Sequence, residues 1–231
     1  MGIATLVGGW GREVEASGLQ SGNNGFMTGA FIVLEGGEGS GKSTQARLLC
    51  DWLRAAGHGV TQTFEPGATA RGARIRQLLL DDDAPLDPRA ELLLMAADRA
   101  QHVHEVVLPA LAANTIVVSD RFEPSSLAYQ GVGRGLGVET VAEMSAFARA
   151  GLEPDLVVVL DVADAVAAQR RPIATDRMER AGADFHAAVR SAYRTLAIER
   201  GWVVVDGDGT PEVVAQRVRD VVETCLQRVL R

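Results

Sequence analysis

Glycines, a lysine and hydroxyl side chains follow one another at fixed spacing near residue 40. At such spacing, glycines allow successive backbone N–H groups to face a phosphate chain, and a helix that starts at the lysine adds the positive end of its dipole. The pattern therefore predicts a phosphate-binding loop for a nucleoside triphosphate. The loop consists of Gly36, Gly37, Glu38, Gly39, Ser40, Gly41, Lys42, Ser43 and Thr44.

Two side chains of this loop have the chemistry for a bound nucleoside triphosphate and its Mg²⁺. Lys42 is placed to reach the β- and γ-phosphates, and the Ser43 hydroxyl can ligate Mg²⁺. Asp120 follows a short apolar run and is a second candidate Mg²⁺ ligand. The flanking sequence favours this interpretation over a chance glycine-rich turn: residues 30–35 are strand-like, and apolar residues recur at helical spacing after the loop.

Glu65 and Arg76 form a second candidate group. Glu65 stands directly after a predicted strand, and Arg76 lies on the helix that follows. Arginine binds phosphate groups in a bidentate manner, so Arg76 is a candidate ligand of a second substrate's phosphate. A solvated helix arginine is the alternative for Arg76.

Arg99 falls in the middle of an apolar helical stripe that spans residues 92–107. A guanidinium that faces inward needs a partner, because a buried charge without hydrogen bonds is costly. Two interpretations remain open at this point. Arg99 forms a structural ion pair, for instance with Glu65 or Asp120, or it contacts a carbonyl of a bound base.

Residues 120–131 are dense in directional polar groups. Arg121 is a candidate for bridging negatively charged phosphates, while Ser126 and Gln130 are candidates for contacting the edge of a base. Turn-forming and capping roles explain the serines equally well.

Strand-like and helix-like segments alternate along the chain. Apolar runs predict strands at residues 30–35, 59–64, 115–119, 156–160 and 202–205, and helices are expected at 70–80, from Pro88, and at 210–230. Such alternation predicts an α/β fold in which a five-stranded parallel sheet carries helices on both faces. Ligands of such sheets bind at the carboxyl ends of the strands, where all the groups above are placed.

The chain has 231 residues, which suits a single domain over residues 30–231. A formal charge of −7 argues against a basic surface for nucleic acid, and no apolar run approaches the roughly 20 residues that span a bilayer. We expect a soluble cytoplasmic protein whose Cys50 and Cys225 are reduced core residues. Residues 1–29 are rich in Gly, Ser and Asn and are expected to be a disordered extension, with Met27 as the functional start.

The sequence resembles the bacterial thymidylate kinases, phosphate-loop kinases that transfer the γ-phosphate of ATP to dTMP. The resemblance runs in order through residues 30–230. It rests on the segments FIVLEGGEGSGKST, EPGAT, AADRAQHV, DRFEPSSLAYQG, LEPDLVVVLDV and DRME. It implies the phosphate-loop kinase fold with a short lid near residues 170–183, ATP and Mg²⁺ as cofactors, dTMP as the substrate, and a homodimer.

The resemblance also implies roles for single residues. Glu38 is expected to contact the sugar 3′-hydroxyl and Arg99 the base, while Arg76 and Arg121 hold the acceptor phosphate. Lys42 and Arg121 are accordingly candidate catalytic residues.

The resemblance assigns the pyrimidine to a further group of residues. Ser126 and Gln130 are expected to recognise thymine, and Tyr129 to disfavour a ribose 2′-hydroxyl. The family usually has a phenylalanine stacking on thymine where this chain has Met95, which is apolar and polarizable and can still pack against a ring.

Four arginines lie in or beside a polar segment that resembles the mobile lid of these enzymes: Arg170, Arg171, Arg177 and Arg180. Family members without an arginine in the phosphate loop place catalytic arginines in the lid, where they stabilise charge during phosphoryl transfer. Arg171 is the first candidate and Arg170 the second, and a solvated charged loop is the alternative. The rival functions are a kinase for another nucleoside monophosphate and a non-catalytic ATP-binding switch.

Overall fold

The computed structural model describes residues 29–80, 85–170, 177–178 and 180–230. Its strands are β1 (Phe31–Glu35), β2 (Val60–Phe64), β3 (Ile116–Asp120), β4 (Leu156–Asp161) and β5 (Val203–Asp206). They form one parallel sheet in the order β2-β3-β1-β4-β5. The predicted α/β class and the five-stranded parallel sheet are therefore confirmed.

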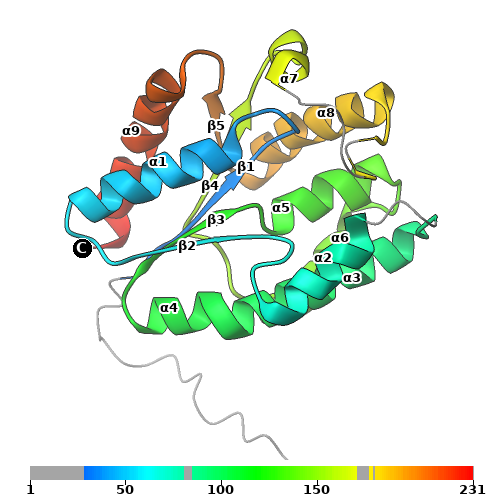
Figure 1. Ribbon diagram of the computed structural model, residues 1–231, viewed down its shortest axis with the longest axis horizontal. Coiled ribbons are helices and arrows are strands. Elements are labelled where there is room, and N and C mark those ends of the chain that lie inside the picture. The colour runs from blue at the N-terminus through cyan, green and yellow to red at the C-terminus, as the bar shows by residue number, and fades with distance from the viewer. Residues whose placement is uncertain (1–28, 81–84, 171–176, 179, 231) are drawn as a thin grey trace, which may run out of the picture.

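Helices connect the strands and cover both faces of the sheet (Figure 1). The α-helices are α1 (Lys42–Ala55), α2 (Ala70–Leu80), α3 (Pro88–His102), α4 (Leu108–Ala112), α5 (Glu123–Ser126), α6 (Val138–Ala148), α7 (Asp164–Arg170), α8 (Ala183–Arg200) and α9 (Pro211–Val229). Two π-helical segments, η1 (Val103–Val107) and η2 (Leu127–Gly133), extend α3 and α5.

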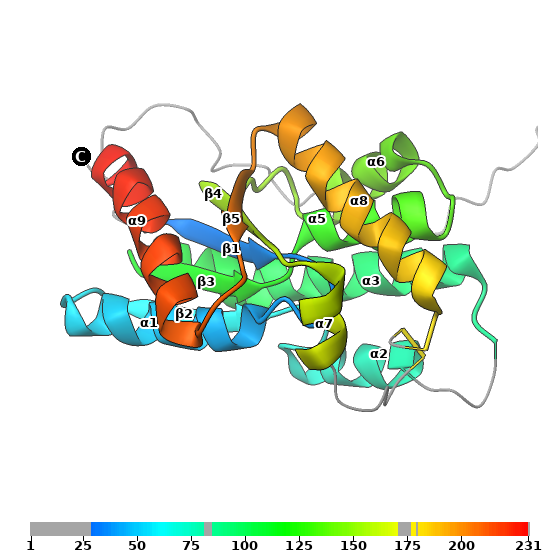
Figure 2. The same ribbon diagram turned by 90° about the horizontal axis from the view of Figure 1, so that it is seen from above.

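The core has two layers because alternate residues of a strand point to opposite faces of the sheet. On β1, Phe31 and Val33 pack with α3, η1 and α8, whereas Ile32 and Leu34 pack with α1 and α9. Helix α8 lies beside α6 in Figure 2, and both pack on η2. Both faces of the sheet are thereby buried, as its apolar strands require.

Helices α6 and α7 were not predicted from the sequence. Helix α7 has seven residues and buries only Ala167, so it carries no apolar periodicity that a pattern could detect. Its last residue is Arg170, which the sequence analysis assigned to the lid. Helix α8 begins at Ala183, where the expected lid ends.

Several expectations fall outside the part of the chain that the structure describes. These are the predicted extension up to residue 28, and Arg171 with the neighbouring residues of the expected lid. Cys50 and Cys225 are buried and form no disulfide, as predicted. No helix within the described ranges has the length and apolar character needed to cross a bilayer.

Candidate active site

The phosphate-binding loop connects the carboxyl end of β1, the central strand, to the start of α1. Gly39 and Gly41 have left-handed backbone angles, with φ of 77° and 92°, which a glycine adopts without steric cost. The Lys42 Nζ donates hydrogen bonds to the carbonyl oxygens of Gly36 and Gly37, at 3.0 and 2.8 Å. Burial and the positive charge of Arg121 lower the pKa of Lys42. The loop thus holds its ammonium group against its own backbone.

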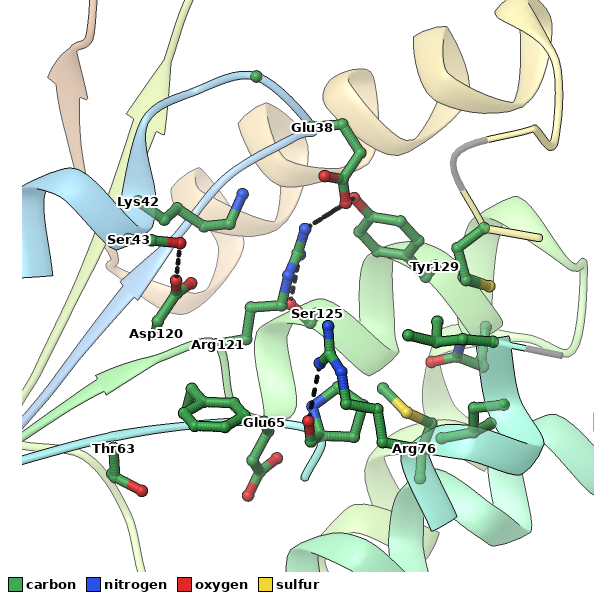
Figure 3. Close-up of a pocket in the computed structure, with 18 of the residues that line it drawn as sticks. Glu38, Lys42, Ser43, Thr63, Glu65, Arg76, Asp120, Arg121, Ser125 and Tyr129 are labelled. Atoms are coloured by element: carbon green, nitrogen blue, oxygen red, sulfur yellow. Dashed lines mark hydrogen bonds and ion pairs between the residues drawn. The ribbon is translucent and has the colours of Figure 1, made fainter. Parts of the chain in front are cut away.

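Ser43 and Asp120 meet beside this loop (Figure 3). Asp120 ends β3 and is in register with Leu34 of β1, which places its carboxylate next to the start of α1. The Ser43 hydroxyl donates to Asp120 Oδ2 at 2.5 Å, and Oδ1 is buried with no hydrogen-bond partner among the described residues. A hydroxyl and a carboxylate with a spare oxygen suit Mg²⁺. The described residues contain no cluster of three or more His, Cys, Asp or Glu side chains for a metal ion, so phosphate oxygens and water would complete such a site.

Arg121 follows β3, and its guanidinium contacts the loop that follows β1. It ion-pairs with Glu38 of the loop, and it donates to the Tyr129 hydroxyl at 3.2 Å and to Ser125 Oγ at 2.9 Å. Although burial opposes ionisation, the charges of Arg121 and Lys42 lower the pKa of Glu38 to about 2. Glu38, which is predicted to contact the sugar, and Arg121, which is predicted to contact the phosphate, are therefore direct neighbours, as Figure 3 shows.

Glu35 lies beneath Arg121 and was missed by the sequence analysis. Its carboxylate is fully buried and accepts hydrogen bonds from Phe122 N at 2.8 Å, Ser125 Oγ at 2.7 Å and the Tyr193 hydroxyl at 2.7 Å. Burial raises the pKa of Glu35. These bonds fix the turn that follows β3, so Glu35 positions Arg121. The sequence signal that could have identified Glu35 is a glutamate at the end of an otherwise apolar strand.

A cavity of about 680 Å³ opens between the phosphate loop, the end of β2, α2, α3 and η2. Such a volume is in the range of small-molecule sites. The candidate residues that line it are Glu38, Gly39, Gly41, Lys42, Ser43, Thr44, Glu65, Arg76, Met95, Asp120, Arg121, Tyr129 and Gln130. The structure thus brings most of the predicted site together.

Arg99 and Ser126 are not among the residues that line this cavity. The Arg99 side chain is 1% exposed, and its Nε lies 2.9 Å from Glu65 Oε2. The remaining nitrogens donate to Ser145 Oγ at 3.0 Å and to Ser126 Oγ at 3.1 Å. The structural ion pair that the sequence left open is therefore present, while the contact of Arg99 or Ser126 with a base stays a prediction.

Gln130 lines the cavity and pairs with Glu91 of α3. Its Nε2 donates to Glu91 Oε1 at 2.7 Å, and its Oε1 is buried without a partner among the described residues. Glu91 was also missed. The signal was its spacing, because Glu91, Met95 and Arg99 are separated by four residues and share one face of α3.

Arg170, Arg177 and Arg180 lie within the described residues, and the first two have different surroundings. Arg170 donates to the carbonyl oxygens of Gly207 and Gly209, both at 3.0 Å, and does not line the cavity. Arg177 contacts Leu79 O at 3.1 Å and Glu91 Oε2 at 2.8 Å, so its guanidinium joins α2 and α3. The catalytic roles assigned to Arg170 and Arg171 stay predictions.

Comparison with known proteins agrees with this geometry. The family model described as thymidylate kinase matches residues 34–218, most of the chain. This chain belongs to the thymidylate kinase family. The thymidylate kinase of Clavibacter sepedonicus is 48% identical over 199 residues, covering 84% of this chain and 94% of that protein. The thymidylate kinase of Synechococcus sp. (strain JA-3-3Ab) is 46% identical over 195 residues, covering 84% and 95%.

Solved structures of thymidylate kinases include a similar fold. The crystal structure of thymidylate kinase from Ehrlichia chaffeensis has a TM-score of 0.71 and 28% identity to this chain. It covers 84% of this chain and 98% of its own. The phosphate-loop kinase fold that the resemblance implied is therefore confirmed.

Proposed function

We propose that this protein transfers the γ-phosphate of ATP to dTMP, which yields ADP and dTDP for dTTP synthesis. The observation that carries the proposal is that the phosphate loop, Arg76, Arg121 and Gln130 line the same cavity. Membership in the thymidylate kinase family supports dTMP as the acceptor.

ATP binds with its phosphates on the loop amides and Lys42. The Lys42 ammonium, which is held on the Gly36 and Gly37 carbonyls, turns toward the β- and γ-phosphates when they arrive. Ser43 and Asp120 would hold Mg²⁺, and its charge would neutralise the phosphate oxygens.

The acceptor phosphate binds between Arg76 and Arg121. Arg76 donates to Pro66 O at 2.8 Å, which fixes its guanidinium at the cavity wall, and Arg121 is fixed by Glu38 and Ser125. An acceptor phosphate oxygen is already anionic near neutral pH, so the reaction requires no general base. Alignment and charge neutralisation supply the catalysis.

The nucleoside lies along η2 and α3. Met95 packs against the pyrimidine ring, and Gln130 Oε1 accepts a hydrogen bond from the pyrimidine. Glu38 accepts from the sugar 3′-hydroxyl, and the Tyr129 hydroxyl, 2.9 Å from Glu38 Oε1, leaves no room for a 2′-hydroxyl. Arg171 and Arg170 are proposed to act in the lid, with Arg171 first.

We further propose a homodimer in the cytoplasm, which family membership supports. Sedimentation equilibrium of the purified protein tests the assembly, and a monomer at micromolar concentration would contradict it.

The test of function is ATP consumption with Mg²⁺ in the presence of dTMP, dUMP, dCMP, dGMP, UMP or thymidine. We expect dTMP to be preferred and Arg121→Ala to lose most of this activity. Preference for another monophosphate would refute dTMP as the substrate. ATP binding without turnover in the presence of any acceptor would instead indicate a nucleotide-dependent switch.

A further inference from the structure

Glu91 is a buried carboxylate for which the proposed reaction has no role. It lies on α3 with 1% of its side chain exposed. Three groups converge on it: Gln130 Nε2 at 2.7 Å, an Arg134 nitrogen at 3.2 Å and an Arg177 nitrogen at 2.8 Å. Two of these partners are cations and the third is a residue of the cavity wall.

The surroundings of Glu91 keep it ionised. Burial works against the charged form, but hydrogen bonds from Gln130, Arg134 and Arg177 outweigh it and lower the pKa of Glu91. An ionised carboxylate accepts hydrogen bonds and cannot donate one. The end of the Gln130 amide that faces Glu91 must therefore be the NH₂ group.

The opposite end of this amide is consequently the oxygen. Gln130 lines the cavity, and its Oε1 is buried without a hydrogen-bond partner among the described residues. A buried acceptor without a donor is unfavourable, so a ligand that presents an N–H to it is favoured over a ligand that does not.

We infer that Glu91 fixes the orientation of the Gln130 amide and thereby makes the cavity select a pyrimidine with a hydrogen on N3. Thymine carries this N–H, whereas cytosine carries a lone pair that would face the Gln130 oxygen. Glu91 is thus a positioning residue that acts through Gln130. The inference rests on the proposed function, because it takes a pyrimidine monophosphate as the acceptor.

The test compares kcat/KM for dTMP and dCMP, with saturating MgATP, in the wild type and in Glu91→Gln. A glutamine at position 91 offers both a donor and an acceptor, so either orientation of the Gln130 amide is satisfied. We expect the dTMP/dCMP ratio to fall on the order of tenfold or more. An equal loss with both acceptors, which leaves the ratio unchanged, would overturn the inference.

Arg177→Met is the matched control, because it removes a cation from Glu91 and leaves the bond between Glu91 and Gln130. We expect it to change activity with both acceptors by the same factor. If this variant lowered the ratio as far as Glu91→Gln, the contact between Arg177 and Glu91 and not the orientation of the amide would set the preference, and the inference would be wrong.

The double variant Glu91→Gln/Gln130→Glu reverses the donor and the acceptor of the pair. The carboxylate at position 130 again presents an acceptor to N3, so the dTMP preference should return, and continued loss of preference would contradict the inference. This variant carries the same test if Glu91→Gln does not fold. If turnover is lost, dissociation constants of dTMP and dCMP from calorimetry replace kcat/KM. A wild type that is inactive with dTMP refutes the proposed function itself.

Discussion

Arg99 and Glu65 form an ion pair that is almost fully shielded from water. The Arg99 Nε lies 2.9 Å from Glu65 Oε2, and the two side chains are 1% and 2% exposed. The second carboxylate oxygen of Glu65 contacts His102 Nδ1 at 2.8 Å. Because both charges are paired inside the protein, removal of either one leaves the other uncompensated.

Arg99→Met tests whether this pair is structural. Loss of one partner of a buried ion pair costs about 3 to 5 kcal/mol, so chemical denaturation should show a fall of that size in the free energy of unfolding. The control is Arg71→Met, which removes an exposed ion pair with Glu105 and should cost less than about 1 kcal/mol. A raised KM for dTMP with unchanged stability would show instead that Arg99 serves the base.

Asp98→Asn should change how stability depends on pH. Burial and the negative charge of Glu65 raise the pKa of Asp98 to about 6 from 3.8. Its Oδ1 accepts from Gly67 N at 3.0 Å, while Oδ2 has no hydrogen-bond partner among the described residues. The folded state therefore binds this proton more tightly than the unfolded state does. Stability from this group is present below about pH 4 and is lost as the pH rises to about 6.

At pH 8 the variant should consequently exceed the wild type in stability by roughly 2 to 3 kcal/mol. Thermal denaturation between about pH 4 and pH 8 measures the effect. Asp51→Asn, at an exposed ion pair with Arg47 on α1, is the control and should leave the pH profile as it is. Identical profiles for the wild type and Asp98→Asn would contradict the prediction.

Gly39→Ala should impair ATP binding. A Cβ at this position would lie 2.6 Å from the carbonyl oxygen of Ala167 in α7, and the backbone is left-handed with φ of 77°. Gly135 has a similar φ of 71° but no atom within 4 Å of an added Cβ. Gly135→Ala therefore measures the backbone cost alone, about 1 to 2 kcal/mol. We expect Gly39→Ala to lose more stability than Gly135→Ala and to raise KM for ATP. Equal losses in the two variants would show that α7 moves aside without an energetic cost.

Asp120→Asn should weaken the response to Mg²⁺. It replaces the carboxylate that bonds Ser43 and holds an unpartnered oxygen, so the Mg²⁺ concentration at half-maximal rate should rise on the order of tenfold or more. Asp161→Asn is the control, since this aspartate also ends a strand but pairs with Arg194 at 2.9 Å. A matching rise in the control would mean that Asp120 has no special relation to the metal.

The phosphate loop and the strands could be predicted from short stretches of the sequence. The phosphate loop can be recognised from consecutive residues alone, because its glycines supply the backbone freedom that the loop requires. Short apolar runs likewise indicate buried strands. The strands differ from the predicted ranges by no more than one residue at either end. Helix α7 escaped prediction because a short helix with one buried residue has no periodic signal.

The partners of the buried charges were decided by the tertiary structure. Glu35 meets Tyr193 across 158 positions, and Arg121 meets Glu38 across 83. For Arg99 the sequence showed that an inward-facing guanidinium needs a partner, and only the fold selected Glu65. By itself the sequence determined which groups lie at the carboxyl ends of the strands, because most of these groups directly follow a short apolar run. Burial and pairing depend on side chains brought together from distant segments, so only the packed structure could assign them.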